Sequence, residues 1–390
     1  MWPFARKTPE GIPGGYSPGA EPFLSVIVAD RADDTARLVF ADWLQENGDE
    51  ERAVFIRDQI ELARTHPSYQ NEEVRRATFG PDDHARYERQ RQFVTSNASK
   101  WLTGFPAGVL TAVTESTFRR GFPVSVELTP RRWLEEGERL RRWVPLEGVW
   151  IDGQQERFAH LMSDPTLLGL SELGLNRAGT DELRSLADSS ALDTLESLRV
   201  SGRSLNGTVE VPVLRRLFGS ARLSRLRSLR VWLDRAGDTL GFVVGGSPHL
   251  RCLETLDLSD AMRYEAARDL FDSPNMANVT SLELPNNPMG DVAIRGLVRS
   301  KYLTRLTTLR LNDAALTAES GRLLADWPGL RTVRLLYLNG NELGRNGVEA
   351  LSDSPHLLQL RWLAISDNVP LAEAGWAKAL PGFARIPHVF

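Results

Sequence analysis

The sequence predicts an α/β fold in which stacked strand–helix units form a solenoid behind an all-helical N-terminal domain. A six-residue pattern of aliphatic residues recurs nine times between residues 146 and 365, at a mean interval of just under 27 residues. Helical periodicity fills the intervals between the copies. Residues 21–65, in contrast, carry helical patterns and helix caps without the recurring strand pattern.

The recurring pattern is L-x-x-L-x-L, with valine or isoleucine at some of the leucine positions. Its copies begin at Leu146, Leu170, Leu195, Leu226, Leu253, Val279, Leu306, Val333 and Leu360. The L-x-L part has period two, which predicts a short strand with one buried face. One unit cannot bury its leucines alone, so neighbouring units must stack. We therefore expect a right-handed solenoid with parallel strands on the concave face and helices on the convex face.

The segments between the strands have helical spacing and definite ends. In the segment 291–298, the apolar residues at 293, 294, 297 and 298 share one face of a helix. Three Ser-Pro dipeptides, Ser247-Pro248, Ser273-Pro274 and Ser354-Pro355, predict helix ends because proline cannot continue the hydrogen-bond ladder.

This repeat resembles the leucine-rich-repeat family, and its length and full helices are similar to the ribonuclease-inhibitor-like subclass. The resemblance covers about residues 146–368. The ninth position of the family's pattern is Asn here only at Asn287, Asn341 and Asn368. The resemblance therefore implies a ladder of side-chain amides along the turns, and this ladder is incomplete.

A less regular unit precedes the repeats. Gly121–Leu128 alternates in the manner of a strand. Thr129 is a suitable helix cap, and Pro130 suits the first helical position. We expect a helix at Arg131–Trp143, with its apolar face against the first strands.

The N-terminal segment predicts three helices. The first is Glu21–Ala29. Asp33 or Asp34 caps the second, which Asn47-Gly48 closes in the left-handed conformation, and Asp49 caps the third. A separate helical domain therefore lies ahead of the repeats.

The residues of this domain closely resemble the repeat-companion domain that accompanies leucine-rich repeats in certain bacterial paralogue families. The similar segments are residues 37–44, residues 48–57 and Gln59. The resemblance implies association with repeats and no established catalytic activity. We expect four parts in the chain: a flexible tail (1–20), the companion domain (21–65), a helical connector that caps the solenoid (66–116, helical around Asp83–Leu102), and the solenoid with a C-terminal cap (117–390).

Composition limits the class of protein. The 47 basic and 51 acidic residues nearly balance, so we expect no bulk attraction to nucleic acid or to an anionic membrane. No stretch reaches 18 consecutive apolar residues, and the first residues lack a signal-peptide pattern. We expect a cytoplasmic protein. The oligomeric state stays open.

The residues that could carry chemistry favour a non-enzyme. Cys252 is the only cysteine, lies in a turn that we expect to be part-buried, and has no activating base indicated by the sequence. His249 and His356 occupy the same slot of two different repeats, so they cannot share a metal. The H-E-x-x-H, C-x-x-C and phosphate-loop motifs are absent. We therefore expect no catalytic residues, no metal and no cofactor.

Two charged groups admit a functional and a structural interpretation. Asp42, Arg37, Arg52 and Arg57 could form a site in the companion domain, or an ion-pair network that fixes the helix angles. The arginines of the segment 131–142 could contact nucleic acid, or could be neutralised by glutamates three or four positions away, as the pairs Glu135–Arg139 and Glu138–Arg142 predict. We favour the structural interpretation of both groups.

The concave face is the best candidate for a binding surface. The residues that we expect to contact a partner are Trp150, Arg199, Arg230, Trp232, Asp257, Glu283, Arg310, Tyr337 and Trp362. Neighbouring rows are about 4.8 Å apart, so the charges of Arg230–Asp257 and Glu283–Arg310 can pair. Exposed Trp, Tyr and Arg dominate the binding energy of interfaces. The alternative is that the tryptophans fold over onto neighbouring rows.

Three hypotheses of function follow. The first is a non-enzymatic scaffold that binds a protein partner through the concave face. The second is an adaptor or regulatory subunit that recruits an enzyme through the companion domain, and this version requires an accessible pocket around Asp42, Arg37 and Arg57. Nucleic-acid binding through the arginines ranks below both.

Overall fold

The computed structural model describes residues 12–17, 19–66, 75, 78–106, 118–152, 157–202, 209–233, 236–259, 262–369 and 374–390. The chain divides into two compact units, Met1–Ile151 and Asp152–Phe390. The domain boundaries expected from the sequence stay a prediction, because the first unit also contains the irregular strand–helix unit that precedes the repeats.

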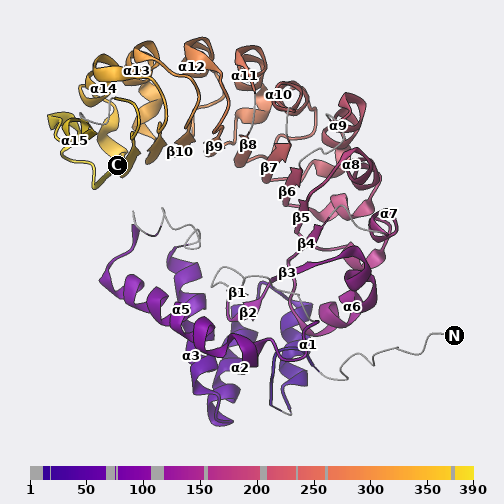
Figure 1. Ribbon diagram of the computed structural model, residues 1–390. Coiled ribbons are helices and arrows are strands. Elements are labelled where there is room, and N and C mark those ends of the chain that lie inside the picture. Colours follow the sequence, from indigo (N-terminus) through magenta and orange to yellow (C-terminus); the bar gives the residue numbers. More distant parts are fainter. Residues whose placement is uncertain are drawn as a thin grey trace. The chain divides into compact units, whose positions relative to one another are not determined.

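The first unit begins with helices, as predicted. They are α1 (Glu21–Ala29), α2 (Asp34–Glu46), α3 (Glu50–Thr65) and α5 (Pro81–Trp101) (Figure 1). The Asp33 carboxylate caps α2 by accepting a hydrogen bond from the Thr35 amide at 2.8 Å. Gly48 follows α2 with φ +83°, the left-handed conformation that ends a helix. The buried faces of α1, α2 and α3 share one apolar core around Phe40.

Part of the expected flexible tail packs against these helices. The Gly14 amide donates to the carbonyl of Thr103 at 2.8 Å, and Arg52 Nη1 donates to the Gly14 carbonyl at 2.6 Å. The guanidinium of Arg52 also lies 3.8 Å from the centre of the Tyr16 ring. The expectation of a flexible tail is therefore wrong for residues 12–17, whereas residues 1–11 and 18 lie outside the described ranges.

A hairpin and the irregular unit complete the first part of the chain. Strands β1 (Phe118–Arg119) and β2 (Phe122–Pro123) pair in antiparallel fashion. Strand β3 (Ser125–Leu128), helix α6 (Pro130–Trp143) and strand β4 (Gly148–Asp152) follow, and β3 pairs with β4 in parallel. The helix begins one residue earlier than expected, at the predicted proline.

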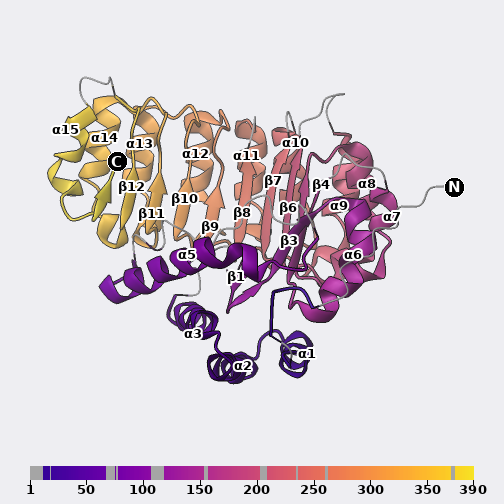
Figure 2. The same cartoon turned by 60° about the horizontal axis from the view of Figure 1, so that its bottom comes forward.

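The second unit is the predicted α/β solenoid. Its strands are β5 (Glu172–Asn176), β6 (Ser197–Gly202), β7 (Ser228–Leu233), β8 (Thr255–Ser259), β9 (Ser281–Glu283), β10 (Thr308–Arg310), β11 (Leu335–Tyr337), β12 (Trp362–Ala364) and β13 (His388–Val389). They are ordered in the sheet as in the sequence, and each recorded pairing is parallel (Figure 2).

One helix follows most strands on the outer side of the curved sheet (Figure 1). The helices are α7 (Phe158–Leu161), α8 (Thr180–Ala187), α9 (Val211–Phe218), α10 (Gly237–Gly245), α11 (Tyr264–Phe271), α12 (Gly290–Arg299), α13 (Ala318–Ala325), α14 (Gly344–Ser352) and α15 (Ala374–Lys378). Short 3₁₀ turns such as Pro274–Met276 lead from helix to strand. Helices α10, α11 and α14 end just before their Ser-Pro dipeptides, so the predicted stops are confirmed.

The leucines of the pattern fill the space between strands and helices. In the strand β8 unit, for example, Leu253 and Leu256 are fully buried and Leu258 is almost so. Burial of each such side chain contributes about 2 kcal/mol. This continuous apolar layer explains why the units must stack.

Two series of polar side chains tie each repeat to its neighbour. The predicted amide ladder is present at the three asparagines: the amide nitrogens of Asn287, Asn341 and Asn368 donate to the carbonyls of Leu258, Leu311 and Leu338, respectively, at 2.7 to 2.8 Å. The second series consists of serines at the helix ends, and we call it the serine ladder. Its members are Ser189, Ser247, Ser273, Ser300 and Ser354, whose hydroxyls donate at 2.5 to 2.6 Å to a backbone carbonyl of the preceding repeat.

Within the described ranges, the helices are all too short or too polar to cross a bilayer.

Candidate functional site

The middle residues of the strands form one aligned row on the inner face of the solenoid. The register pairs Arg199 with Arg230, Arg230 with Asp257, and Asp257 with Glu283. It continues through Arg310 and Tyr337 to Ala364. The row predicted from the L-x-L pattern is therefore confirmed in the second unit. Trp150 belongs to the first unit, where it is half-buried opposite Glu127 of β3.

Trp232 is an accessible aromatic residue of this inner face, because 37% of it is exposed. Its indole Nε1 donates to Asp257 Oδ1 at 2.9 Å, and the hydroxyl of Ser259 donates to the same oxygen at 3.0 Å. Burial raises the pKa of Asp257, the nearby Glu283 raises it further, and the two hydrogen bonds only partly oppose this. The Asp257 carboxylate thus fixes the indole by a hydrogen bond, although burial disfavours the charged form of the carboxylate.

Two arginines belong to the same part of the inner face, Arg199 on β6 and Arg230 two residues before Trp232 on β7. The guanidinium of Arg199 lies 5.6 Å from the centre of the Trp232 ring. Burial lowers the pKa of Arg199, and the positive charge of Arg230 on the next strand lowers it further. The Nε of Arg230 is buried and makes no hydrogen bond within the described part of the chain. We call Arg199, Arg230 and Trp232, together with Asp257, which accepts the indole hydrogen bond, the Trp232 patch.

The C-terminal part of the row is packed rather than accessible. Arg310 pairs with Glu283 at 3.3 Å, as predicted, and lies 4.0 Å from the centre of the Tyr337 ring. Tyr337 is only 3% exposed and Trp362 only 7%. Trp362 stacks on Phe390 with ring centres 4.5 Å apart. The expectation of exposed aromatics is therefore wrong for Tyr337 and Trp362, which fold onto neighbouring rows.

The recorded hydrogen bonds of Asp257 differ from the pairing that the sequence suggested. Arg230 lies directly opposite Asp257 and favours its charged form. The hydrogen bonds, however, come from Trp232 and Ser259. The indole therefore occupies the position that we expected a guanidinium to take.

The four charged residues singled out in the N-terminal helices make separate contacts. Arg57 pairs with the exposed Asp42 at 2.6 Å. Arg37 is 1% exposed and donates to the carbonyl of Asp33 at 2.9 Å, whereas the buried Arg52 contacts the segment 12–17. The structural interpretation fits these contacts, because burial of Arg37 and Arg52 removes them from an accessible pocket around Asp42.

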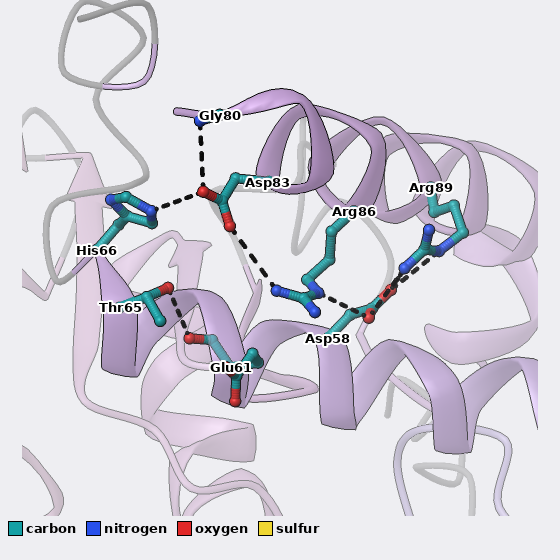
Figure 3. Close-up of polar contacts among 8 residues, drawn as sticks. All are labelled: Asp58, Glu61, Thr65, His66, Gly80, Asp83, Arg86 and Arg89. Atoms are coloured by element: carbon teal, nitrogen blue, oxygen red, sulfur yellow. Dashed lines mark hydrogen bonds and ion pairs between the residues drawn. The ribbon is translucent and has the colours of Figure 1, made fainter. Parts of the chain in front are cut away.

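A polar network that the sequence did not reveal joins α3 to α5 (Figure 3). His66 Nε2 lies 3.0 Å from Asp83 Oδ2. Asp58 accepts hydrogen bonds from Arg89 and forms an ion pair with Arg86. The adjacent Thr65 hydroxyl donates to the Glu61 carbonyl, so it is not activated by the histidine. The network fastens α3 to α5 and offers no nucleophile.

The arginine-rich helix α6 pairs several of its arginines with its own glutamates. Arg131 and Arg132 both pair with Glu135, at 2.9 and 3.4 Å, and Arg139 pairs with Glu136 at 3.0 Å. These partners differ from the two expected pairs, but they have the same three- or four-residue spacing. At least three of the five arginines of the helix are therefore paired with glutamates of the same helix.

Cys252 is exposed, so the expectation of a part-buried thiol is wrong. It lines a shallow pocket of about 390 Å³ with Arg227, Glu254, Asn278, Thr280 and Arg305. Arg227 and Glu254 pair with each other, which leaves no activating base beside the thiol in the described pocket wall. Within the described residues, moreover, His, Cys, Asp and Glu nowhere form a group of three that could hold a metal.

Comparison with known proteins gives a likeness of fold alone. No protein-family model and no curated protein matches the chain. An internalin from Listeria monocytogenes is 15% identical with a TM-score of 0.35, over 64% of this chain and 68% of the internalin. Rad7, solved in complex with Elc1 from yeast, is 18% identical with a TM-score of 0.39, over 64% and 71% of the chains. A protein from Bacteroides fragilis is 15% identical with a TM-score of 0.37, over 62% of this chain and 81% of that protein. Similarity at this level identifies no function, and we base none on it.

Proposed function

We propose that this protein is a non-enzymatic scaffold that binds a protein partner through the inner strand face of its solenoid, with the Trp232 patch at the centre of the interface. The observation that supports this most is the accessible indole, which a buried carboxylate holds in one orientation. Trp and Arg are the residue types that most often supply binding energy. An indole already fixed loses little conformational entropy when a partner covers it.

The test is a binding measurement on two matched substitutions. A partner is first isolated by co-purification with the full chain and identified, and its dissociation constant is then measured directly. Trp232→Ala should weaken binding by about 2 kcal/mol, or roughly 30-fold. Phe242→Ala on α10 removes an aromatic side chain of similar exposure from the outer helices, and it should leave binding unchanged.

Trp232→Phe separates the contribution of the aromatic ring from that of the hydrogen bond that fixes it. It keeps an aromatic ring but loses the Nε1 donor to Asp257, so we expect an intermediate affinity. Unchanged affinity in Trp232→Ala would place the interface elsewhere and contradict the proposal.

The adaptor alternative predicts a different result from the same assay. If the companion domain recruits an enzyme, Arg57→Ala should weaken the complex and Trp232→Ala should not. We further propose, on the sequence resemblance, that the repeats belong to the ribonuclease-inhibitor-like subclass and that residues 21–65 are a bacterial repeat-companion domain. From the near-balance of basic and acidic residues, we also propose that the protein acts in the cytoplasm without binding nucleic acid or membranes.

A further inference from the structure

The turns that lead into the last four strands carry an unbalanced positive charge. We call these turns the basic edge, and they are residues 300–307, 327–334, 354–361 and 380–387. They contain six exposed cationic side chains and no aspartate or glutamate, and the six are Lys301, Arg305, Arg331, Arg334, Arg361 and Arg385. Asp326 and Asp353 immediately precede two of the turns, so an excess of four positive charges stays even when both aspartates are counted.

The equivalent turns earlier in the solenoid have paired charges. Three arginines ahead of β7 each pair with a carboxylate of a neighbouring turn: Arg222 with Asp193, Arg225 with Glu196, and Arg227 with Glu254. In the described part of the chain, by contrast, the six cations of the basic edge form no ion pair with a carboxylate. Arg305 donates to Asn278 and Arg331 to His356, both at 3.0 Å. The same position in the repeat is therefore neutralised in one part of the solenoid and left positive in another.

The strand register brings two of these cations to neighbouring rows. The Arg334 amide donates to the Thr307 carbonyl at 2.7 Å, and the Arg361 amide donates to the Arg334 carbonyl at 2.8 Å. Neighbouring rows are about 4.8 Å apart. Like charges opposite each other are unfavourable, so Arg334 and Arg361 gain from an anion that contacts both.

An exposed leucine lies within this group of charges. Leu358 is 68% exposed, in the 3₁₀ turn Leu357–Gln359, three residues before Arg361. The hydrogen bond from Arg331 Nε to His356 Nδ1 joins this turn to the preceding one. Removal of an exposed leucine from water is favourable, so the basic edge offers an apolar contact between its cations.

From this combination we infer that the basic edge binds an acidic segment of a protein partner, and that this segment carries an aliphatic side chain that covers Leu358. The excess of positive charge attracts an anionic chain and orients it. Surfaces that bind single-stranded nucleic acid combine cations with aromatic rings on which bases stack. The side chain exposed here is aliphatic, which favours a peptide. The surface goes beyond the proposed function, because the Trp232 patch lies on β6, β7 and β8.

Fluorescence anisotropy of the full chain tests the inference. The probe is a fluorescent peptide in which glutamate and leucine alternate, and its affinity should fall as the salt concentration rises. Arg334→Gln and Arg361→Gln should each weaken binding about threefold. Leu358→Ser should weaken it about fivefold, because the apolar contact is lost.

Two residues at equivalent positions of other repeats provide matched controls. Arg227 corresponds to Arg334 but pairs with Glu254. Leu168 corresponds to Leu358 and is 41% exposed, but its turn, residues 163–171, contains no lysine or arginine. Arg227→Gln and Leu168→Ser should therefore leave the affinity for the peptide unchanged.

Each outcome supports or overturns the inference. The substituted side chains are exposed, so the variants should fold, and circular dichroism checks this. Absence of peptide binding, equal binding of a peptide with glutamine in place of glutamate, or equal weakening by the two controls would overturn it. Tighter binding of oligouridylate, with no effect of Leu358→Ser, would assign the surface to nucleic acid and also overturn it. Trp232→Ala should not change the affinity for the peptide, so this test is independent of the proposed function.

Discussion

The amide of Asn341 offers the sharpest test of how the repeats hold together. Its nitrogen donates to the carbonyls of Leu311 and Leu338, both at 2.8 Å. Its oxygen accepts hydrogen bonds from the amides of Ala314 and Leu316, at 3.0 and 3.1 Å. The side chain is buried, so water does not replace these partners without a change of structure. We predict that Asn341→Ala is one of the most destabilising single substitutions in the solenoid.

The magnitude follows from the groups left without a partner. The Leu338 carbonyl keeps a hydrogen bond from Asn368 at 2.8 Å. Among the residues that the structure describes, the Leu311 carbonyl and the amides of Ala314 and Leu316 keep no other hydrogen-bond partner. Each buried unsatisfied group costs about 1 kcal/mol at the lower end of the usual range, so we expect a loss of about 3 kcal/mol.

Hydrogen exchange and urea unfolding of the full chain measure the effect. The amides of Ala314 and Leu316 should exchange about 100-fold faster in Asn341→Ala, if opening of this turn limits exchange. Asn339→Ala is the control, since its side chain accepts one exposed hydrogen bond, from the Ser366 amide. The prediction is refuted if Asn341→Ala lowers the free energy of unfolding no more than Asn339→Ala does, and if the amides of Ala314 and Leu316 exchange at the wild-type rate.

Three further predictions concern single contacts. Ser273→Ala removes one member of the serine ladder and should lower the free energy of unfolding by about 1 kcal/mol in urea titrations; no loss would show that water replaces the hydroxyl. Asp257→Asn keeps an acceptor for Trp232 and removes a carboxylate whose pKa burial raises. Because the folded protein raises the pKa of Asp257, its stability falls as the pH rises above about 3.9, the pKa of Asp in the unfolded chain. Asp257→Asn should therefore be more stable than the wild type at pH 7 and lose this advantage in acid. A variant that is less stable than the wild type at pH 7 contradicts this prediction. Burial opposes ionisation of Asp83, but the bonds from His66 and a backbone amide outweigh it and lower the pKa of Asp83. The stabilisation of the fold by the Asp83 carboxylate should be complete above about pH 3.9 and lost at lower pH. Asp83→Asn should abolish this pH-dependent loss of stability in acid titrations followed by circular dichroism.

The sequence was sufficient for the features that depend on local periodicity. The strands appear where L-x-L occurs, since period two leaves only one face to bury. Helix α1 has the predicted bounds, and Thr129 caps α6 as its position before Pro130 suggested. The Asn341 contacts also follow from a single residue at a fixed place in the repeat.

Features that depend on distant contacts were not predictable. Trp362 is buried because Phe390 stacks on it, and nothing in the repeat pattern places that residue there. The segment 12–17 looks like a tail by composition, but Arg52 fixes it through a carbonyl and an aromatic ring. Three serines of the ladder, Ser247, Ser273 and Ser354, were recognised only as parts of helix stops, and Ser189 and Ser300 were not recognised, because a hydroxyl's partner in the preceding unit leaves no local signal.

The serine ladder has a consequence for how such a gene can change in length. Its hydrogen bonds join residues 27 to 29 positions apart, which is about one repeat. Duplication or deletion of one whole unit recreates the same partner on each side of the junction. A change of half a unit instead sets hydroxyls opposite leucines throughout the affected turn. Selection should therefore tolerate copy-number variation in whole modules and remove fractional ones.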